Sequence, residues 1–459
     1  MLRSAILILS GNAATALLLL IRNLIVARLI PVADYGVAAT FAIAMAVVEM
    51  TSALGLQQQI VQARNGEDPR FQAALQGFQV LRGTIAAVAL FGLAGPIAAF
   101  MAVPEAVWAY RVLAVVPLLN ALVHFDIYRA NRTMVFLPVI LTGAVPALLS
   151  TLVIWPLFAW YGDYRVMLYA IVLQAGLTVI TSQLLATRPY RLLLDRTIMA
   201  DSLRFGWPIL ANAVLLFLVF NGDKVIVGRA LGMATLAIFA MGFTLTLTPM
   251  LVLEKSAQAF FLPQLTALTA AADRPRFVQV AMATAQAHLA FGAALVVGVV
   301  VIGAPVVHLL LGPKYAALLP LLTWLAILQA ARVFKGVSSP MALARAQTEV
   351  SMYASLPRVA ALPLAAYIAG TTGNIVLVIQ LAILAELVGF ALTLWLLRAR
   401  LDLPLDPLVW PVLTCLALLI GAAVLPDRIA MPVTAGLFVL ALVSMQDLRR
   451  YVLGQWHRV

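Results

Sequence analysis

The sequence predicts an all-α, polytopic membrane protein with about fourteen spanning helices. Of its 459 residues, 64% are hydrophobic and only 10% are charged, whereas soluble domains are about half apolar and a quarter charged. Apolar stretches of about twenty residues, the length that crosses a bilayer, recur along almost the whole chain. These stretches are continuously apolar and rich in Ala and Leu, without the alternation of a β-barrel strand.

The expected spans follow one another with short connections. They cover residues 5–30, 37–58, 74–101, 107–128, 134–160, 164–186, 206–231, 234–253, 277–304, 316–334, 350–369, 374–397, 408–425 and 430–446. The last two are short enough for a re-entrant or interfacial pair, which would leave a core of about twelve helices. The longest polar stretches, residues 62–73, 187–205 and 264–277, leave no room for a soluble domain.

Basic residues gather in alternate loops, as between the sixth and seventh expected spans, which are joined by Arg188, Arg191, Arg196 and Arg204. The positive-inside rule places these loops in the cytoplasm, so the number of spans is even and both termini are cytoplasmic. The net charge of +12 therefore reflects membrane topology, and we expect no nucleic-acid partner.

An internal repeat predicts the arrangement of the helices. Residues Leu24–Arg28 match residues Val225–Arg229, and the same register aligns Arg22 with Asp223. Six spans separate the copies, so they run in the same direction, as in parallel repeats that form two lobes about an axis along the membrane normal. We expect two six-helix lobes related by a pseudo-two-fold axis, residues 1–200 and 201–400, followed by a helix pair and cytoplasmic tail, residues 401–459.

Catalytic and cofactor motifs are missing from the sequence. It has no G-x-x-x-x-G-K-[ST], H-E-x-x-H or G-x-S-x-G pattern, which argues against an enzyme and against ATP-driven transport by this chain alone. The single cysteine, Cys415, excludes a disulfide framework. The histidines lie singly, which is typical of structural positions, at residues 124, 288, 308 and 457. We therefore expect no cofactor and no metal.

Several charged residues lie inside the expected spans: Arg22, Glu49, Asp223, Lys224 and Glu386. A charge in hydrocarbon costs at least about 2–3 kcal/mol, so such a group normally faces a partner or a water-filled cavity. Other charges lie at span ends, where long side chains snorkel to the interface, and we interpret them in that way. They are Arg28, Arg229, Arg82, Glu254, Lys255, Arg332 and Lys335.

The repeat-matched charges suggest a transport cavity. Because Arg22 and Asp223 correspond in the repeat, we expect them to face each other across the lobe interface and to form an ion pair that closes the empty cavity. Cations there suit an anionic substrate, since Arg binds phosphate through several donors. The candidate substrate-binding residues are Arg22, Arg28, Asp223, Lys224 and Arg229, and the candidate coupling or gating residues are Glu49, Asp223 and Glu386.

Four stretches, weak singly but specific in their order and spacing, carry a resemblance to a known family. They are residues 27–36 (ARLIPVADYG), 204–208 (RFGWP) with 223–232 (DKVIVGRALG), 261–265 (FLPQL) and 310–322 (LLGPKYAALLPLL). The chain resembles bacterial oligosaccharide flippases of the polysaccharide transporter branch, in the superfamily that also holds multidrug and toxin extruders and the lipid II flippase.

The resemblance implies a bacterial inner-membrane protein that moves undecaprenyl-diphosphate-linked oligosaccharides from the cytoplasmic to the periplasmic face by alternating access. Cavity cations would meet the diphosphate and sugar, while the lipid tail stays among membrane lipids. Arg22 and Arg28 lie on the first helix, where the lipid II flippase branch also has cavity arginines. Polysaccharide polymerase and other assembly proteins are the implied partners.

Three other functions remain open. A cation-coupled drug exporter of the same superfamily would favour acidic cavity residues, and Glu49, Asp223 and Glu386 keep this alternative alive. A membrane enzyme acting on lipid-linked sugars would need a longer outward loop with catalytic residues. A scaffold without transport activity would leave the buried, repeat-matched charges unexplained. The sequence determines neither the sugar nor the driving force.

Overall fold

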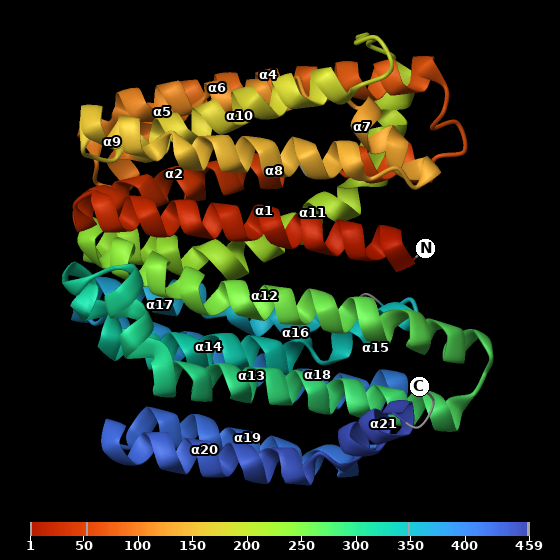
Figure 1. Cartoon of the computed structure of the whole chain (residues 1–459), viewed down its shortest axis with the longest axis vertical. Helices are drawn as coiled ribbons and strands as arrows, with labels where there is room; N and C mark the ends of the chain where they lie inside the picture. The colour runs from red at the N-terminus through yellow and green to blue at the C-terminus, as the bar shows by residue number, and fades with distance from the viewer. Residues whose placement is uncertain (1, 52–53, 348, 457–459) are drawn as a thin grey trace. The chain divides into compact units, whose positions relative to one another are not determined.

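The computed structural model describes every residue except 1, 52–53, 348 and 457–459. Some further side chains, including those of residues 2–10, are outside the description. Every regular element among the described residues is a helix, which confirms the predicted fold class (Figure 1). Contacts between residues divide the chain into two compact units, Met1–Ala237 and Ile238–Val459. The lobe boundaries expected from the repeat stay a prediction.

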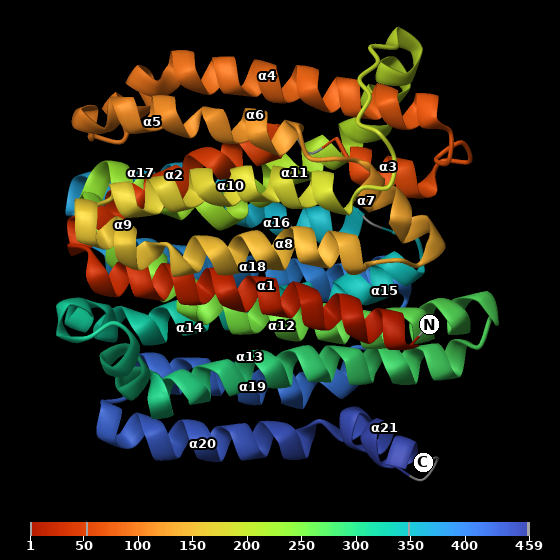
Figure 2. The same cartoon turned by 45° about the horizontal axis from the view of Figure 1, so that its top comes forward.

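Unit 1, Met1–Ala237, is built mainly on long helices that lie side by side. α1 packs along α8, α8 along α10, and α4 against α5 and α6 (Figure 2). Its helices are α1 (Leu2–Leu29), α2 (Val32–Thr51), α3 (Leu56–Gln62), α4 (Pro69–Phe100), η1 (Pro104–Ala106), α5 (Val107–Leu113), α6 (Val115–Ala121), α7 (Asp126–Arg129), η2 (Ala130–Thr133), α8 (Leu137–Leu152), α9 (Ile154–Tyr161), α10 (Arg165–Leu185) and α11 (Arg196–Leu231).

Unit 2, Ile238–Val459, has α14 packed between α13 and α18, and α19 against α13 and α20. α12 begins in unit 1 and continues into unit 2. The helices are α12 (Met233–Ala270), α13 (Arg274–Leu310), η3 (Pro313–Leu318), α14 (Leu319–Gly336), α15 (Ser338–Ala344), α16 (Glu349–Ala360), α17 (Leu362–Thr372), α18 (Ile375–Leu401), α19 (Asp406–Val424), α20 (Asp427–Ser444) and α21 (Gln446–Trp456).

Among the described residues, 11 helices are long and apolar enough to cross a membrane, or up to 13 if each of two bent pairs is one span. One bent pair is α20 with α21, which meet at 66°. The expected span 37–58 is wrong as a single helix, because α2 ends at Thr51 and α3 starts at Leu56. Gly55, in the left-handed conformation at φ 65°, lies between them, and an L side chain rarely adopts that backbone.

Two helices begin or end well outside their expected spans. α11 starts at residue 196, ten residues earlier than expected, because Asp195 caps it by accepting hydrogen bonds from the backbone N–H groups of Thr197 and Ile198. The hydrogen bond from the Ile198 backbone N–H is the largest of the interactions that hold the pKa of Asp195 below its usual range. α12 continues to Ala270, beyond the expected end of its span at residue 253.

Candidate functional site

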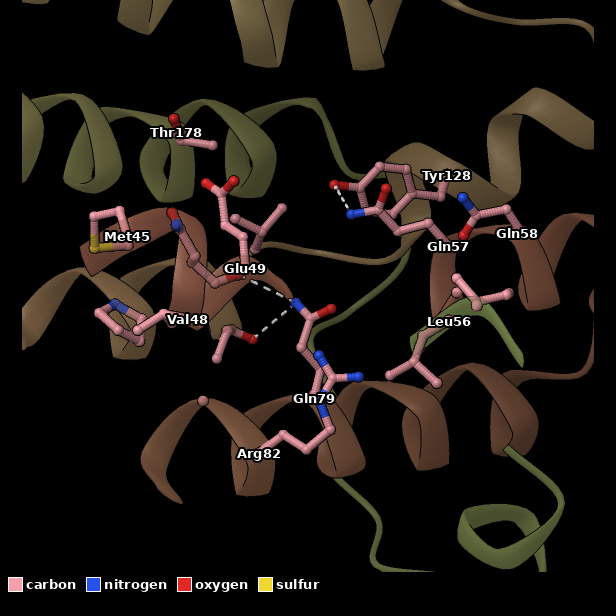
Figure 3. A pocket seen from close by; sticks show the side chains of 17 residues that line it. Met45, Val48, Glu49, Leu56, Gln57, Gln58, Gln79, Arg82, Tyr128 and Thr178 are labelled. Carbon is pink, nitrogen blue, oxygen red and sulfur yellow. Dashed lines mark hydrogen bonds between the residues drawn. The ribbon is translucent and has the colours of Figure 1, made fainter. Parts of the chain in front are cut away.

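Unit 1 contains a polar cavity of about 410 Å³ between α2, α3, α4, α6, α7, α10 and α11 (Figure 3). Its wall combines one carboxylate, one guanidinium, several carboxamides and two hydroxyl groups. These polar side chains are Glu49, Arg82, Gln57, Gln58, Gln79, Asn120, Tyr128 and Thr178. The cavity is within the 300–1,000 Å³ range of small-molecule sites, but its wall is richer in hydrogen-bonding groups than an apolar drug pocket.

Hydrogen bonds to neighbouring helices hold two of the cavity amides in place. Gln79 of α4 donates to the backbone oxygens of Asn120 and Ala121 at the end of α6, at 3.2 Å each. Gln57 of α3 donates to the Tyr128 hydroxyl at 2.9 Å, and both sets of bonds are visible in Figure 3. The cavity wall is therefore preorganised, and the amide oxygens, which these bonds do not use, can accept hydrogen bonds.

Two opposite charges face the cavity from different helices. Glu49 is on the exposed part of α2, and its carboxylate points toward Thr178 of α10 (Figure 3). Arg82 extends from α4 beside Gln79, with its guanidinium 5.8 Å from the centre of the Phe78 ring. Arg82, which the sequence interpretation treats as a residue that snorkels to the interface, lines the cavity.

Arg22 lines an adjoining chamber of about 280 Å³ that shares Met45, Glu49, Asn120 and Thr178 with the first cavity. It is 8% exposed and donates hydrogen bonds to Gln174 of α10 and, at 3.5 Å, to Ser150 of α8. Its Nε has no hydrogen-bond partner among the described residues. The positive charge of Arg22 is thus held by neutral oxygen atoms and remains electrostatically available to an anion.

The other predicted cavity residues are outside these two chambers. Asp223 of α11 is 2% exposed, and the neighbouring Lys224 donates to Asn221 at 3.4 Å. We expected Arg22 to pair with Asp223. Among the described residues, the hydrogen bonds of Arg22 go instead to Ser150 of α8 and Gln174 of α10. Arg28 and Arg229 occupy the last turns of α1 and α11, and both are exposed.

Unit 2 contains a different arrangement of charges, a buried cluster around Glu386. Its carboxylate is fully buried in α18 and lies 2.9 Å from the Nε of Arg332, 2.7 Å from the Nζ of Lys335 and 3.6 Å from the Nε of Arg358. The Arg332 guanidinium also stacks on Phe243, 5.0 Å from the ring centre. We call these four charged residues the Glu386 cluster.

The cluster corrects the sequence interpretation of Arg332 and Lys335 as residues that snorkel to the interface. Their side chains are only 7% and 11% exposed, because Glu386 attracts them inward from the adjacent helix. Arg332 and Lys335 are three residues apart on α14, so they share a face of that helix. In the sequence, the signal for the cluster was the i, i+3 spacing of Arg332 and Lys335 together with an acid, Glu386, inside another span.

The cavity amides were also missed, because an amide within a span carries no charge and does not stand out in an apolar pattern. Gln57, Gln79, Asn120 and Gln174 come from four separate helices. No local spacing brings them together. Only the packing of α3, α4, α6 and α10 places their side chains along one connected cavity.

Comparisons with known proteins agree with this fold. The family model described as "Polysaccharide biosynthesis protein" matches residues 25–320. The lipid II flippase MurJ, in an inward closed conformation, has a TM-score of 0.70 at 12% identity, with 97% of this chain and all of that chain covered. An inward-facing multidrug resistance transporter of the MATE family, in the MOP superfamily, has a TM-score of 0.66 at 15% identity, with 84% and 94% covered.

A further MOP superfamily transporter, from Pyrococcus furiosus, has a TM-score of 0.56 at 16% identity, with 87% of this chain and 95% of that chain covered. Its description reports a reversed polarity of the binding pocket and a different function. No curated protein sequence matches significantly. The chain thus has the fold of MOP superfamily transporters, which is also the fold of a lipid II flippase and of a multidrug resistance transporter.

Proposed function

Because the chain belongs to the polysaccharide biosynthesis protein family, we propose that it is a flippase for undecaprenyl-diphosphate-linked oligosaccharides. It moves repeat units from the cytoplasmic to the periplasmic face of a bacterial inner membrane, by alternating access, for surface polysaccharide biosynthesis. Both termini lie in the cytoplasm, as the distribution of basic loops indicates. The lipid tail remains among membrane lipids, and polysaccharide polymerase receives the product.

The observation that carries this proposal is the environment of Arg22, a buried guanidinium with only neutral hydrogen-bond partners beside an amide-lined cavity. A guanidinium binds phosphate oxygens through several charge-assisted hydrogen bonds. Carboxamides both donate and accept, so they match the hydroxyl groups of a sugar. A headgroup with sugar and diphosphate together therefore fits this wall better than a purely apolar molecule does.

A second candidate function is a cation-coupled drug exporter, and the observation that favours it is Glu49. Its carboxylate faces the cavity from an exposed position, where a proton, a sodium ion or a cationic drug can reach it. The structural relatives include multidrug transporters. Two arginines and one carboxylate around the connected chambers, however, make the wall basic in balance, which favours the anionic substrate.

Deletion of the gene in its native host tests the flippase proposal. We expect undecaprenyl-linked oligosaccharide to accumulate with its sugar on the cytoplasmic face, protected from a membrane-impermeant glycan-modifying enzyme, and surface polysaccharide to be lost. Wild-type complementation restores both. Unchanged surface polysaccharide, together with a gain in sensitivity to cationic drugs, would contradict the flippase and support the exporter.

A further inference from the structure

A second, smaller cavity of about 240 Å³ lies between α4 and the segment that joins α10 to α11. Its lining shares no residue with the two chambers described above and consists of Pro69, Gln72, Ala73, Gln76, Arg188, Pro189 and Arg191. In the proposed topology this segment is cytoplasmic. We call this cavity the α4 loop pocket.

Backbone contacts hold the loop against the helix. The backbone N–H of Leu193 donates to the Ala73 oxygen at 3.1 Å. The Leu193 oxygen is so close to Gly77 that a Cβ there would be 2.2 Å away, so only glycine allows this approach. These contacts fix both sides of the pocket, α4 on one side and the segment that joins α10 to α11 on the other.

Both glutamines of the pocket present hydrogen-bond donors. The Gln72 oxygen accepts from Nη1 of Arg188 at 3.1 Å, and the Gln76 oxygen accepts from the Phe125 backbone N–H at 3.4 Å. What remains on each is its NH₂ group. Gln76 is 1% exposed, and its amide lies beside the Tyr190 hydroxyl. Because an amide nitrogen carries two hydrogens, at least one donor is left for a ligand.

The charge around the pocket is positive. The Glu67 carboxylate is shared by Arg129, Arg132 and Arg188, and Asp126 pairs with Arg129. Arg191 is exposed and forms no ion pair within the described part of the chain. Cations outnumber carboxylates here, and the neutral groups offer N–H donors, so the pocket suits an anion and repels a cation.

From this donor set we propose that the α4 loop pocket binds a phosphate-type oxyanion, either a soluble phosphate compound or the phosphate of a lipid headgroup. Arg191 and Arg188 supply the charge, and Gln76 and Gln72 supply neutral donors that fix the orientation of the oxyanion. The site is separate from the transport cavity, so binding here does not depend on the proposed transport function.

Titration of inorganic pyrophosphate into the purified full-length protein, in phosphatidylcholine nanodiscs, tests the proposal by calorimetry. Gln76→Glu keeps the oxygen that accepts from Phe125 and replaces the free donor with a negative charge, so we expect binding to weaken about tenfold or more. Arg191→Gln leaves the buried residues intact, and we expect a loss of about tenfold. Arg196→Gln, an equal charge change outside the pocket, is the control.

Pyrophosphate binding that is absent in the wild type, or that weakens equally in Arg191→Gln and Arg196→Gln, overturns the site. Normal binding by both Gln76→Glu and Arg191→Gln also overturns it. The source of the phosphate follows from a second titration in nanodiscs that contain phosphatidylglycerol. If phosphatidylglycerol weakens pyrophosphate binding by the wild type but not by Arg191→Gln, the lipid headgroup competes for the pocket and is the source of the phosphate. If phosphatidylglycerol leaves wild-type binding unchanged, the ligand is a soluble phosphate compound.

Discussion

Unit 1 and unit 2 each contain a charged group of side chains inside the predicted membrane region, but they arrange these groups in opposite ways. In unit 1, Arg22 is held by the neutral oxygens of Gln174 and Ser150 beside an open chamber. In unit 2, Glu386 is fully buried among three cations. A charge held by neutral groups keeps its attraction for a ligand, whereas charges that pair with one another neutralise that attraction.

We therefore expect the loss of a charged side chain to affect folding differently in the two units. Removal of Arg22 leaves only neutral polar groups, which a water-filled cavity can solvate, so folding tolerates it. Removal of Glu386 takes away the carboxylate that contacts Arg332, Lys335 and Arg358 and leaves Glu254 as the acid beside Arg332 and Lys335, so we expect a large loss of stability. Five substitutions, in four experiments, test and extend this comparison, in decreasing order of the effect that we expect.

Glu386→Gln is expected to give the largest loss of stability, on the order of 3–5 kcal/mol, because breaking a buried ion pair leaves an uncompensated charge. The measurement is thermal unfolding of the purified protein in detergent. Glu349→Gln, at an exposed position in the first turn of α16, removes the same charge and serves as the control. Equal unfolding temperatures for both variants would contradict the structural importance of the Glu386 cluster.

Arg22→Gln is expected to reduce flipping of lipid-linked oligosaccharide at least about tenfold, since one charge-assisted hydrogen bond to a phosphate contributes about 1.5–3 kcal/mol. Its unfolding temperature stays close to that of the wild type, because the groups left behind, Gln174 and Ser150, are neutral and border a cavity that water can enter. Flipping is measured in proteoliposomes with a labelled substrate. A folded variant that transports normally would exclude Arg22 from substrate binding.

Glu49→Gln separates the two transport functions. In a flippase for an anionic headgroup, the amide keeps the hydrogen bonding of the cavity wall, so we expect oligosaccharide flipping to change by less than about threefold. Among the described residues, this carboxylate is the only acid on the walls of the two chambers, so in a cation-coupled exporter its loss abolishes transport. Drug efflux and oligosaccharide flipping measured on the same variant decide between these outcomes.

Arg28→Gln and Arg229→Gln are expected to have the smallest effects, less than about twofold on flipping, because both side chains are exposed in the last turns of their helices. The assay is the one used for Arg22→Gln, with the wild type as reference. A tenfold loss in either variant would support the original sequence hypothesis that these arginines bind substrate, and would extend the site beyond the two chambers.

The fold class could be predicted from the sequence alone, because few structures satisfy the backbone hydrogen bonds of long apolar stretches in a bilayer. Many helix positions followed for the same reason. The exceptions are the break near Gly55, the expected span 107–128, which is bent by 49° between α6 and α7, and the extensions of α11 and α12. Arg22 was also identifiable from sequence, since a charge in an apolar stretch carries a cost that requires an explanation.

Which side chains face one another depends on how the helices pack. Arg332 and Lys335 appear at a span end in the sequence, yet Glu386 of a different helix attracts them into the interior. The cavity amides leave almost no signal in sequence, because their chemistry depends on the convergence of separate helices. Charge and hydropathy are properties of single residues or short segments, whereas the partners of a side chain are set by the packing of helices distant in the chain.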